Sequence, residues 1–295
     1  MRRLIINADD FGLTAGVNRA ILEATTAGIV TSTTLMASGP AFDDAVSVSR
    51  SVPELGIGCH VILAGAQPCP LLPGNRIPSL VKSPSSECSH FHESIVGFAR
   101  RALSGKLDPD EIEAEATAQF LRVKSAGIAM THFDTHKHTH LFPQVLRPLL
   151  RAARNCGLCA VRNPFPPSGA LPFSILLSNT ALWKRQLQVK WLGRFRSSFQ
   201  DEVQKAGMVS TDGTLGIVIT GSVNIRLFQT VIANLPEGTW EFVCHPGYND
   251  SNLQAAGTRL LESRKLELEV FTSPAARDSL ERHNVQLINF RDLVR

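Results

Sequence analysis

Several features that mark common protein classes are absent from this chain of 295 residues. No stretch approaches the ~20 apolar residues of a membrane span. The apolar run near the N-terminus, residues 4–6, is shorter than the core of about 7–15 residues in a secretory signal. Long polar tracts are missing, which excludes intrinsic disorder. The net charge is only +4 without a dense basic run, which argues against nucleic-acid binding. We expect a globular, cytoplasmic protein.

Cysteine pairs and nucleotide-binding glycine motifs are also scarce. Cys156 and Cys159 form the single CxxC motif, and no second pair stands at the spacing of a structural zinc site. We interpret this pair as packing residues between a helix and a strand. No G-x-G-x-x-G or P-loop follows the first predicted strand, which weakens a nucleotide-binding interpretation.

Apolar periodicity alternates between short β-rich runs and amphipathic helical stretches. We predict strands over 2–8, 30–37, 55–62, 130–136, 159–162, 216–220, 240–244 and 285–290, and helices over 14–27, 41–51, 109–126, 143–155, 174–205, 223–235 and 274–282. Such alternation at this length indicates a single α/β domain, a distorted TIM-like (β/α) barrel with mostly parallel strands. Residues 64–107 are expected to form a long loop excursion, and 164–210 a variable helical insertion.

Polar side chains follow the predicted strands where those strands end. Asp9 and Asp10 end the first strand, His60 ends the third, and His245 ends a late one. A histidine-rich segment over 131–140 continues the fourth strand. The carboxyl ends of parallel strands form one face, so these side chains are expected to converge there.

Adjacent carboxylates and closely spaced histidines suit a metal-dependent reaction. Asp9 and Asp10 repel each other unless a cation or a shared proton relieves them. On an extended strand they would point to opposite sides, so that one ligates a metal and the other acts as a base. The alternative is that one of them caps the following helix.

The histidine-rich segment places polar residues at every second position. If the strand persists, these residues share one face at the mouth of the barrel, some as ligands and others as supporting or substrate-binding groups. They are His132, Asp134, His136, His138 and His140. A solvated histidine-rich loop is the alternative.

Four short motifs resemble those of a known family. They are Asn7-Ala-Asp-Asp-Phe-Gly12, Gly58-Cys-His-Val-Ile-Leu63, Thr131-His-Phe-Asp-Thr-His136 and Cys244-His-Pro-Gly247. The sequence resembles the YdjC-like carbohydrate deacetylases, the ChbG/HpnK group of metal-dependent amidohydrolases. The likeness is specific over residues 1–162 and again near 240–248. It implies a distorted (β/α) barrel that removes acetyl from an N-acetylated amino sugar.

The resemblance also implies roles for individual residues. Asp10, His60 and His136 fit the ligands of one divalent metal ion, and Asp9 fits the catalytic base. His245 falls on the late His-Pro motif. Lys137 stands where some relatives have another histidine, a change that leaves the ligands intact but affects the surroundings of the substrate. Zinc or magnesium is expected ahead of manganese, cobalt or iron.

Amide hydrolysis explains why such residues are needed. A divalent ion polarises the carbonyl and lowers the pKa of water, and a base then takes the proton of that water. A histidine must protonate the amine that leaves, with His245 as the first candidate and His138 as the second. Arg162 holds Asp9 ionised or binds substrate, and Asp134 is a further candidate for substrate binding.

Three rival functions remain open at this point. His132, Asp134 and His245 imitate the 2-His-1-carboxylate triad of a non-haem iron oxygenase. A phosphoesterase on a histidine-rich barrel is the second rival, and a non-catalytic protein that binds carbohydrate or lipid is the third. Paired carboxylates and many strand-end histidines disfavour the third.

One basic stretch indicates a membrane-surface contact. Over 174–199 an apolar run around Phe173, Ile175, Leu176 and Leu177 precedes Trp183 and Trp191, with Lys184, Arg185, Lys190, Arg194 and Arg196 as cations. Aromatic residues beside Lys and Arg suit the surface of a bilayer. A helix covering the barrel explains the same residues. The family resemblance implies a chitooligosaccharide or an acetylglucosaminyl glycolipid such as a hopanoid as substrate, and a weak membrane-surface contact would suit the glycolipid.

Overall fold

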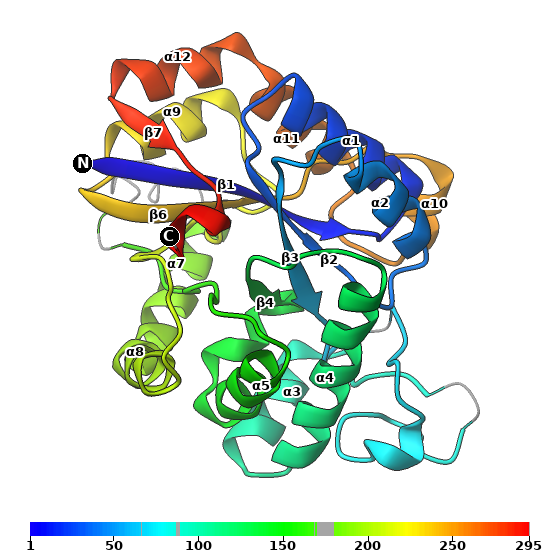
Figure 1. The fold of residues 1–295 in the computed structure, drawn as a ribbon. Helices are drawn as coiled ribbons and strands as arrows, with labels where there is room; N and C mark the ends of the chain where they lie inside the picture. Colours follow the sequence, from blue (N-terminus) through cyan, green and yellow to red (C-terminus); the bar gives the residue numbers. More distant parts are fainter. Residues whose placement is uncertain (66, 87–88, 168, 170–179, 295) are drawn as a thin grey trace.

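Strands occupy the centre of the protein and helices surround them (Figure 1). The computed structural model describes residues 1–295 except 66, 87–88, 168, 170–179 and 295. The strands are β1 (Arg2–Phe11), β2 (Ser32–Leu35), β3 (Gly56–Val61), β4 (Phe133–Thr135), β5 (Gly213–Leu215), β6 (Gly238–Cys244) and β7 (Val285–Leu287). The α-helices are α1 (Ala15–Thr26), α2 (Phe42–Ser49), α3 (Ile95–Leu103), α4 (Pro109–Ser125), α5 (Pro143–Asn155), α7 (Thr180–Leu192), α8 (Arg196–Lys205), α9 (Ile225–Ala233), α10 (Ser251–Ala255), α11 (Glu262–Thr272) and α12 (Pro274–Arg282). Short 3-10 helices are η1 (Gly74–Arg76), η2 (His136–Leu141), η3 (Gly193–Phe195) and η4 (Phe290–Leu293).

The strands form a parallel sheet that curls into a distorted barrel. Their order is β4-β3-β2-β1-β6-β5, and β7 pairs with the beginning of β1. Residues 159–165 connect the two edges, because Phe133 N–H donates to Ala160 O (3.1 Å), Val161 N–H to Val209 O (3.0 Å) and Thr214 N–H to Phe165 O (3.1 Å). The predicted distorted (β/α) barrel is thereby confirmed.

The first strand shows how the sequence builds both sides of the barrel wall. β1 is buried over most of its length, which accounts for its apolar run. Leu4, Ile6 and Ala8 pack in the main core with the helices, whereas Ile5 belongs to a small cluster with Phe290. Side chains alternate along a strand, so Asn7 and Asp9 share the inner face with Ile5.

The lower half of the barrel, where the strands begin, is filled by an aromatic stack. The ring of His132 lies 3.6 Å from that of Phe290, nearly parallel to it, and Phe290 is held by its N–H donating to Ser32 Oγ (3.2 Å). A Cβ on Gly58 would lie 2.6 Å from the His132 ring, so the neighbouring strand must carry glycine there. This packing closes one end and leaves the polar end as the mouth.

Several predicted elements are confirmed and others are wrong. The helices over 143–155 and 274–282 have the predicted bounds, and Thr14 caps α1 by accepting from Val17 N–H (3.1 Å). The strand expected over 216–220 is instead turn, because Gly216 adopts φ +91° and redirects the chain after β5. The strand expected over 159–162 is reduced to isolated bridges.

The helices of the two predicted insertions differ from those expected. The excursion over 64–107 includes α3, and the helix expected over 174–205 is divided into α7 and α8 by η3. The expected apolar run at 173–177 lies outside the described residues. Within the described part of the chain, no helix has the length and apolarity needed to cross a membrane. The CxxC residues are free thiols, with Cys156 buried as expected and Cys159 exposed.

Candidate active site

Three side chains, located at or directly after the ends of three different strands, bring one ligand atom each to a common point at the mouth. Asp10 Oδ1 lies 3.5 Å from His60 Nε2 and 3.6 Å from His136 Nδ1. His60 Nε2 lies 3.3 Å from His136 Nδ1. One oxygen and two imidazole nitrogens grouped in this way are a suitable donor set for a divalent metal ion. Asp10 and His60 are buried, and His136 is partly open to solvent.

An irregularity in β1 turns the two adjacent carboxylates toward the same site. The pairing of β1 with β2 shifts between Ala8 and Phe11, and Asp10 has φ +69°. The strand is therefore not extended at Asp10, and the expectation that Asp9 and Asp10 point to opposite sides is wrong. Each carboxylate instead belongs to a cluster that contains His60.

The ligand atoms are oriented by partners behind them. Arg264, buried on α11, donates from Nη2 to Asp10 Oδ2 (2.5 Å), which leaves Oδ1 toward the histidines. His60 Nδ1 lies 2.7 Å from Asp134 Oδ1. A proton on Nδ1 that bonds Asp134 leaves the Nε2 lone pair available to a metal. Arg264 and Asp134 thus fix the two buried ligands.

Burial and neighbouring charges set the protonation of these ligands. Burial raises the pKa of Asp10, but Arg264 and His136 outweigh it and hold that pKa well below the ordinary value. Burial lowers the pKa of His60, but Asp134 and Asp9 outweigh it and raise that pKa to about 9. The anionic surroundings of His60 thus attract positive charge, which suits a cation site.

Asp9 is held in a buried network centred on Arg162. Arg162 donates from Nη1 to Asp9 Oδ2 (2.8 Å) and from Nη2 to Asp9 Oδ1 (2.6 Å). It also donates from Nε to Glu241 (2.8 Å) and pairs with Asp134. Burial raises the pKa of Asp9, but the charge and hydrogen bonds of Arg162 outweigh it, so that pKa lies far below its ordinary value. Asp9 is ionised at neutral pH.

A second cluster of possible ligands lies deeper than the first. It consists of Asp9, His60 and Asp134. The guanidinium of Arg162 already neutralises both carboxylates of this cluster. A metal ion there would meet a fixed positive charge, so the cluster formed by Asp10, His60 and His136 is the better metal site.

His245 lies beside Asp9 at the end of β6. Its Nε2 is 4.0 Å from Asp9 Oδ2, and its backbone N–H donates to Glu267 Oε2 (2.6 Å). The ring nitrogen Nδ1 is 3.9 Å from the same Glu267 oxygen. Burial lowers the pKa of His245 to about 4, partly offset by Asp10 and Asp9. Glu267, on α11, therefore fixes the backbone from which His245 projects.

Comparison with known proteins agrees with these motifs. The family model described as YdjC-like protein matches residues 3–282. The chain belongs to the YdjC-like family. This YdjC-like protein is 33% identical over 292 residues to a carbohydrate deacetylase of Geobacillus stearothermophilus, covering 99% of this chain and 98% of the relative. It is 26% identical to a carbohydrate deacetylase of Brevibacillus brevis, covering 99% of both.

A solved structure shares the whole fold of this YdjC-like protein. It is the crystal structure of a protein from Enterococcus faecalis V583 whose name assigns it to cellobiose-phosphate cleavage. The TM-score is 0.79 at 27% identity, with 99% of this chain and 98% of the other covered. The family resemblance drawn from the motifs is confirmed.

The histidine-rich segment does not continue as a strand. β4 ends at Thr135, and Lys137 and His138 adopt φ +58° and +52° within η2. His132 therefore lies near the start of its strand, stacked against Phe290. His140 turns back toward β4, where its Nδ1 lies 2.7 Å from Thr135 Oγ1 and its Nε2 donates to Arg162 O (3.1 Å). The expectation that all five alternate residues share one face is wrong.

The remaining predicted site residues are His138, Arg162 and Asp134. His138 is partly buried, and its Nδ1 has no hydrogen-bond partner among the described residues. Burial lowers the pKa of His138, with Arg162 acting in the same direction. Arg162 and Asp134 are completely buried beneath the ligands, where they orient Asp9 and His60. Direct contact of either with substrate stays a prediction.

The proposed iron triad is not assembled by this fold. His132 stacks in the lower barrel, Asp134 bonds His60 and Arg162, and His245 stands beside Asp9. Neither group of ligand atoms found among the described residues combines these three. The structure therefore provides no support for the oxygenase alternative.

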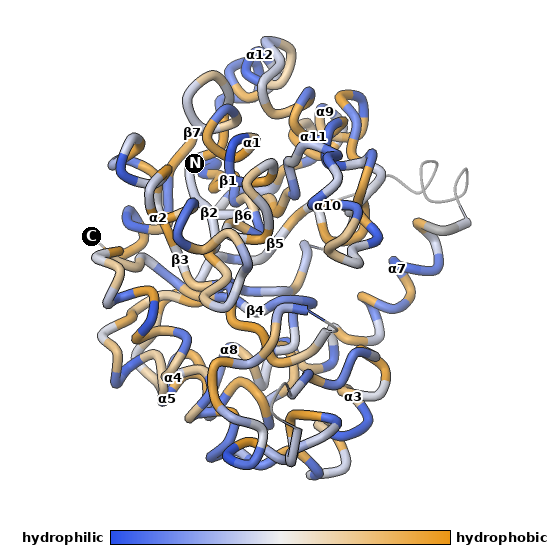
Figure 2. The backbone as a smooth tube through the Cα atoms, turned by 90° about the vertical axis from the view of Figure 1, so that its right-hand side faces the viewer, coloured by the Kyte–Doolittle hydropathy of each residue, from blue (hydrophilic) through white to orange (hydrophobic). Residues whose placement is uncertain are grey.

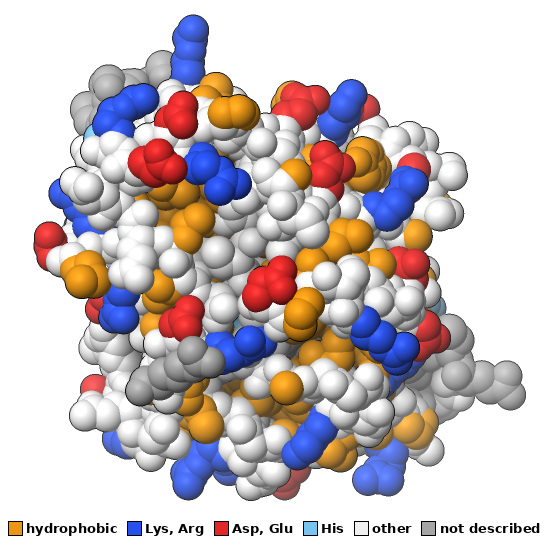
Figure 3. Space-filling view, turned by 45° about the horizontal axis from the view of Figure 1, so that its top comes forward, with side chains coloured by type: hydrophobic (Ala, Val, Ile, Leu, Met, Phe, Trp, Pro, Cys, Tyr) orange, Lys and Arg blue, Asp and Glu red, His pale blue; other side chains and the backbone are white. Residues whose placement is uncertain are grey.

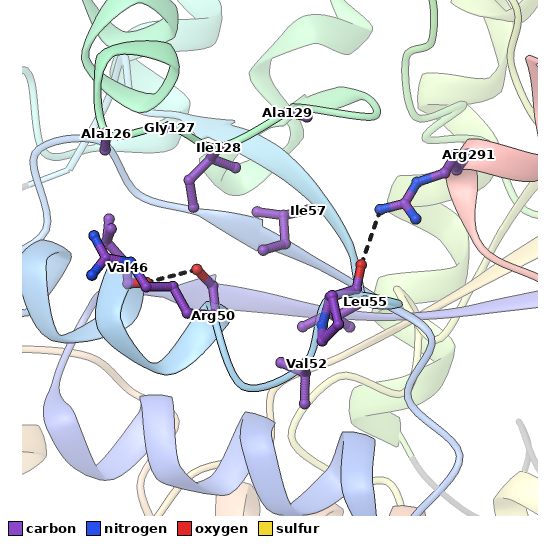
Figure 4. Close-up of a pocket in the computed structure, with 12 residues that line it drawn as sticks. Val46, Arg50, Val52, Leu55, Ile57, Ala126, Gly127, Ile128, Ala129 and Arg291 are labelled. Atoms are coloured by element: carbon purple, nitrogen blue, oxygen red, sulfur yellow. Dashed lines mark hydrogen bonds between the residues drawn. The ribbon is translucent and has the colours of Figure 1, made fainter.

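A cavity of about 210 Å³ lies away from this site (Figure 4). It is lined by Leu55 and Ile57 at the beginning of β3 and by 126–129 after α4, with Arg50 and Arg291 at its edges. The ligand cluster includes His60 at the other end of the same strand. This cavity is separate from the candidate active site.

Proposed function

We propose that this YdjC-like protein is a hydrolase that removes the acetyl group from an N-acetylated amino sugar, using one divalent metal ion. The observation that carries the proposal is the convergence of Asp10 Oδ1, His60 Nε2 and His136 Nδ1 within 3.3–3.6 Å of one another. The names of two relatives as carbohydrate deacetylases support the reaction class.

The donor set fits a catalytic metal site. Three protein ligands leave a coordination position open for water or substrate. When bound, the ion polarises the acetyl carbonyl and lowers the pKa of water. Two imidazoles beside one carboxylate favour zinc over magnesium, because imidazole suits transition ions and oxygen ligands suit magnesium.

Asp9 is the proposed general base. Its Oδ1 accepts hydrogen bonds from Arg162 (2.6 Å), Asn7 (3.0 Å) and Thr34 (3.2 Å), whereas Oδ2 accepts only from Arg162 among the described residues (2.8 Å). The Oδ2 atom therefore retains the capacity to accept a proton from water. The strong pairing with Arg162 keeps Asp9 in the ionised form that a base requires.

His245 is the proposed general acid. Its Nε2 lies 4.0 Å from Asp9 Oδ2, so acid and base flank one reacting centre. Acetate and amine separate when a proton reaches the amine nitrogen. Because the pKa of His245 is about 4, its ring is neutral at pH 7 and would first receive a proton, namely the one that Asp9 takes from water, before delivering it to the amine. His138 is the second candidate for this step, since its Nδ1 has no hydrogen-bond partner among the described residues.

Acetate release from a panel of substrates tests the proposal. The panel contains N-acetylglucosamine oligosaccharides, an acetylglucosaminyl glycolipid and a generic phosphate ester, each with and without a chelator. We expect acetate from at least one N-acetylated substrate, loss of release with chelator, and recovery with zinc. Acetate release that survives complete metal removal contradicts the metal dependence. Phosphate release without acetate would support the phosphoesterase alternative instead.

A further inference from the structure

Helix α7 presents a row of large apolar side chains to solvent. Trp183, Leu187 and Trp191 are 37%, 49% and 53% exposed. At 3.6 residues per turn, their spacing of four places them along one side of the helix. The helix extends from the body of the protein in the view of Figure 2. Exposed aromatic and aliphatic groups in one row are typical of an interaction surface.

Cations flank the same row. Lys184 and Lys190 are exposed, and the Arg194 guanidinium lies 3.5 Å from the Trp191 ring centroid. The helix positions of 183, 184, 187, 190 and 191 cover an arc of roughly 120°. We call Trp183, Lys184, Leu187, Lys190, Trp191 and Arg194 the α7 surface.

The opposite side of α7 attaches the helix to the barrel. Leu182 is buried, and Arg185 donates to Thr220 O (2.6 Å) and Val218 O (3.4 Å). Arg196 likewise donates to Pro166 O. Arg185 and Arg196 therefore hold the segment in place, and the basic residues divide into an anchoring set and a solvent-facing set.

The charge on this segment has one sign. Residues 180–200 contain no Asp or Glu, so nothing acidic within the segment offsets the cations. By contrast, Lys, Arg, Asp and Glu side chains are interspersed over the face shown in Figure 3. The α7 surface is suited to an anionic partner that also accepts indole rings and a leucine side chain.

The α7 surface lies beside the mouth of the barrel. Arg185 bonds residues 218–220, which follow the carboxyl end of β5. Asp10 and His60 lie near the carboxyl ends of their own parallel strands. A partner seated on the α7 surface would therefore lie on the same side of the protein as the candidate active site.

We infer that the α7 surface seats the protein on an anionic lipid bilayer. Tryptophan rings prefer the boundary between headgroups and acyl chains, and Lys and Arg near an anionic leaflet strengthen association. The row of tryptophan and leucine side chains, bordered by cations on the same side of this 13-residue helix, would face the boundary between headgroups and acyl chains. This inference is independent of the proposed reaction.

Vesicle sedimentation and tryptophan fluorescence of the full chain test the inference. The vesicles are phosphatidylcholine alone or mixed with phosphatidylglycerol. We expect association with the anionic vesicles at low salt, weakening as salt increases, and quenching by lipids brominated in the acyl chain. The chain has three tryptophans, and Trp240 is 7% exposed, so the quenching reports Trp183 and Trp191.

Charge variants with a matched control sharpen the test. Lys184→Gln, Lys190→Gln and Arg194→Gln together should weaken binding to anionic vesicles on the order of 10²-fold. Lys106→Gln, Arg154→Gln and Arg282→Gln remove the same charge from other exposed positions and should leave binding within about twofold.

Three results would overturn the inference. The first is no association of the wild type with anionic vesicles at low salt, and the second is association without quenching by brominated lipid. The third is a wild-type dimer that the α7 charge variant converts to monomer without any vesicle binding. That third result would assign the α7 surface to contact between copies of this chain.

Discussion

Arg162 and Asp9 form a two-pronged ion pair that is completely enclosed by the barrel, with N–O distances of 2.8 and 2.6 Å. The same guanidinium also meets Asp134 and Glu241. One cation therefore serves three buried carboxylates. Burial raises the pKa of Glu241 to about 7 against the opposing effect of Arg162, which shows how strongly this region disfavours unpaired negative charge.

Replacing Arg162 should destabilise the protein strongly. Arg162→Met leaves carboxylates buried without their common partner, and breaking such a buried pair costs about 3–5 kcal/mol. Urea unfolding measures the loss. Arg147→Met is the matched control, since its pair with Glu202 (3.1 Å) is at the surface, and it should change stability by about 0–1 kcal/mol. Equal effects of the two variants would refute the central role of Arg162.

A methyl group at Gly58 should disturb the lower barrel. Its Cβ would stand 2.6 Å from the His132 ring, which is itself stacked on Phe290. Gly58→Ala should therefore lower the free energy of unfolding by about 1–3 kcal/mol. Gly193→Ala serves as the control, because a Cβ there meets nothing within 4 Å. Unchanged stability of Gly58→Ala would mean that the His132–Phe290 stack shifts without a cost in free energy, which contradicts this prediction.

His140 should make the protein less stable in acid. Burial, assisted by the charge of Arg162, lowers its pKa to about 3 from the ordinary 6.5. Between these values the unfolded chain binds a proton that the folded protein does not, so this contribution to stability rises with pH from about 3 to 6.5. In His140→Gln the slope should fall by up to about 1.4 kcal/mol per pH unit.

Chemical denaturation at several pH values from 4 to 6.5 measures this slope. His283→Gln, at the end of α12, is the matched control for replacing a histidine outside the barrel. Identical slopes in the wild type and His140→Gln would contradict the buried, neutral state of His140.

Polar residues at the carboxyl ends of the predicted strands explain why much of the site could be predicted. Asp10 and His60 lie near the carboxyl ends of β1 and β3, where parallel strands bring distant residues together. Long amphipathic segments also predicted helices well, as for α5 with its proline at the first turn. These features depend on periodicity and chain direction, which the sequence contains directly.

Other parts of the site could not be predicted because their residues look like ordinary surface charges. Arg264 and Glu267 lie three positions apart on α11, a spacing typical of a solvated helix face. The structure instead buries both, one against Asp10 and the other against the backbone of His245. Their partners are more than twenty residues away in sequence, so only the tertiary fold reveals the contacts.

The end of β4 had no sequence signal of its own. Lys137 and His138 take positive φ angles that non-glycine residues rarely adopt. The sequence therefore predicts an extended strand through the histidine-rich segment. The turn separates His136, which joins the metal site, from His140, which supports the wall near Arg162.

Asp9→Asn should separate catalysis from metal binding. The amide preserves the shape of Asp9 but cannot accept a proton as a base. We expect the metal content to be unchanged and acetate release to slow by roughly 10²–10⁴-fold. A near-normal rate would rule out Asp9 as the base, and loss of metal would make it a ligand.

Metal titration of single variants tests the central claim most directly. Calorimetric zinc binding to the metal-free protein should show one site, and Asp10→Ala, His60→Ala and His136→Ala should each abolish it together with acetate release. His140→Gln, in the same histidine-rich segment, should retain the site. Zinc binding of wild-type affinity and stoichiometry in any of the three alanine variants would contradict the assignment of that residue as a ligand.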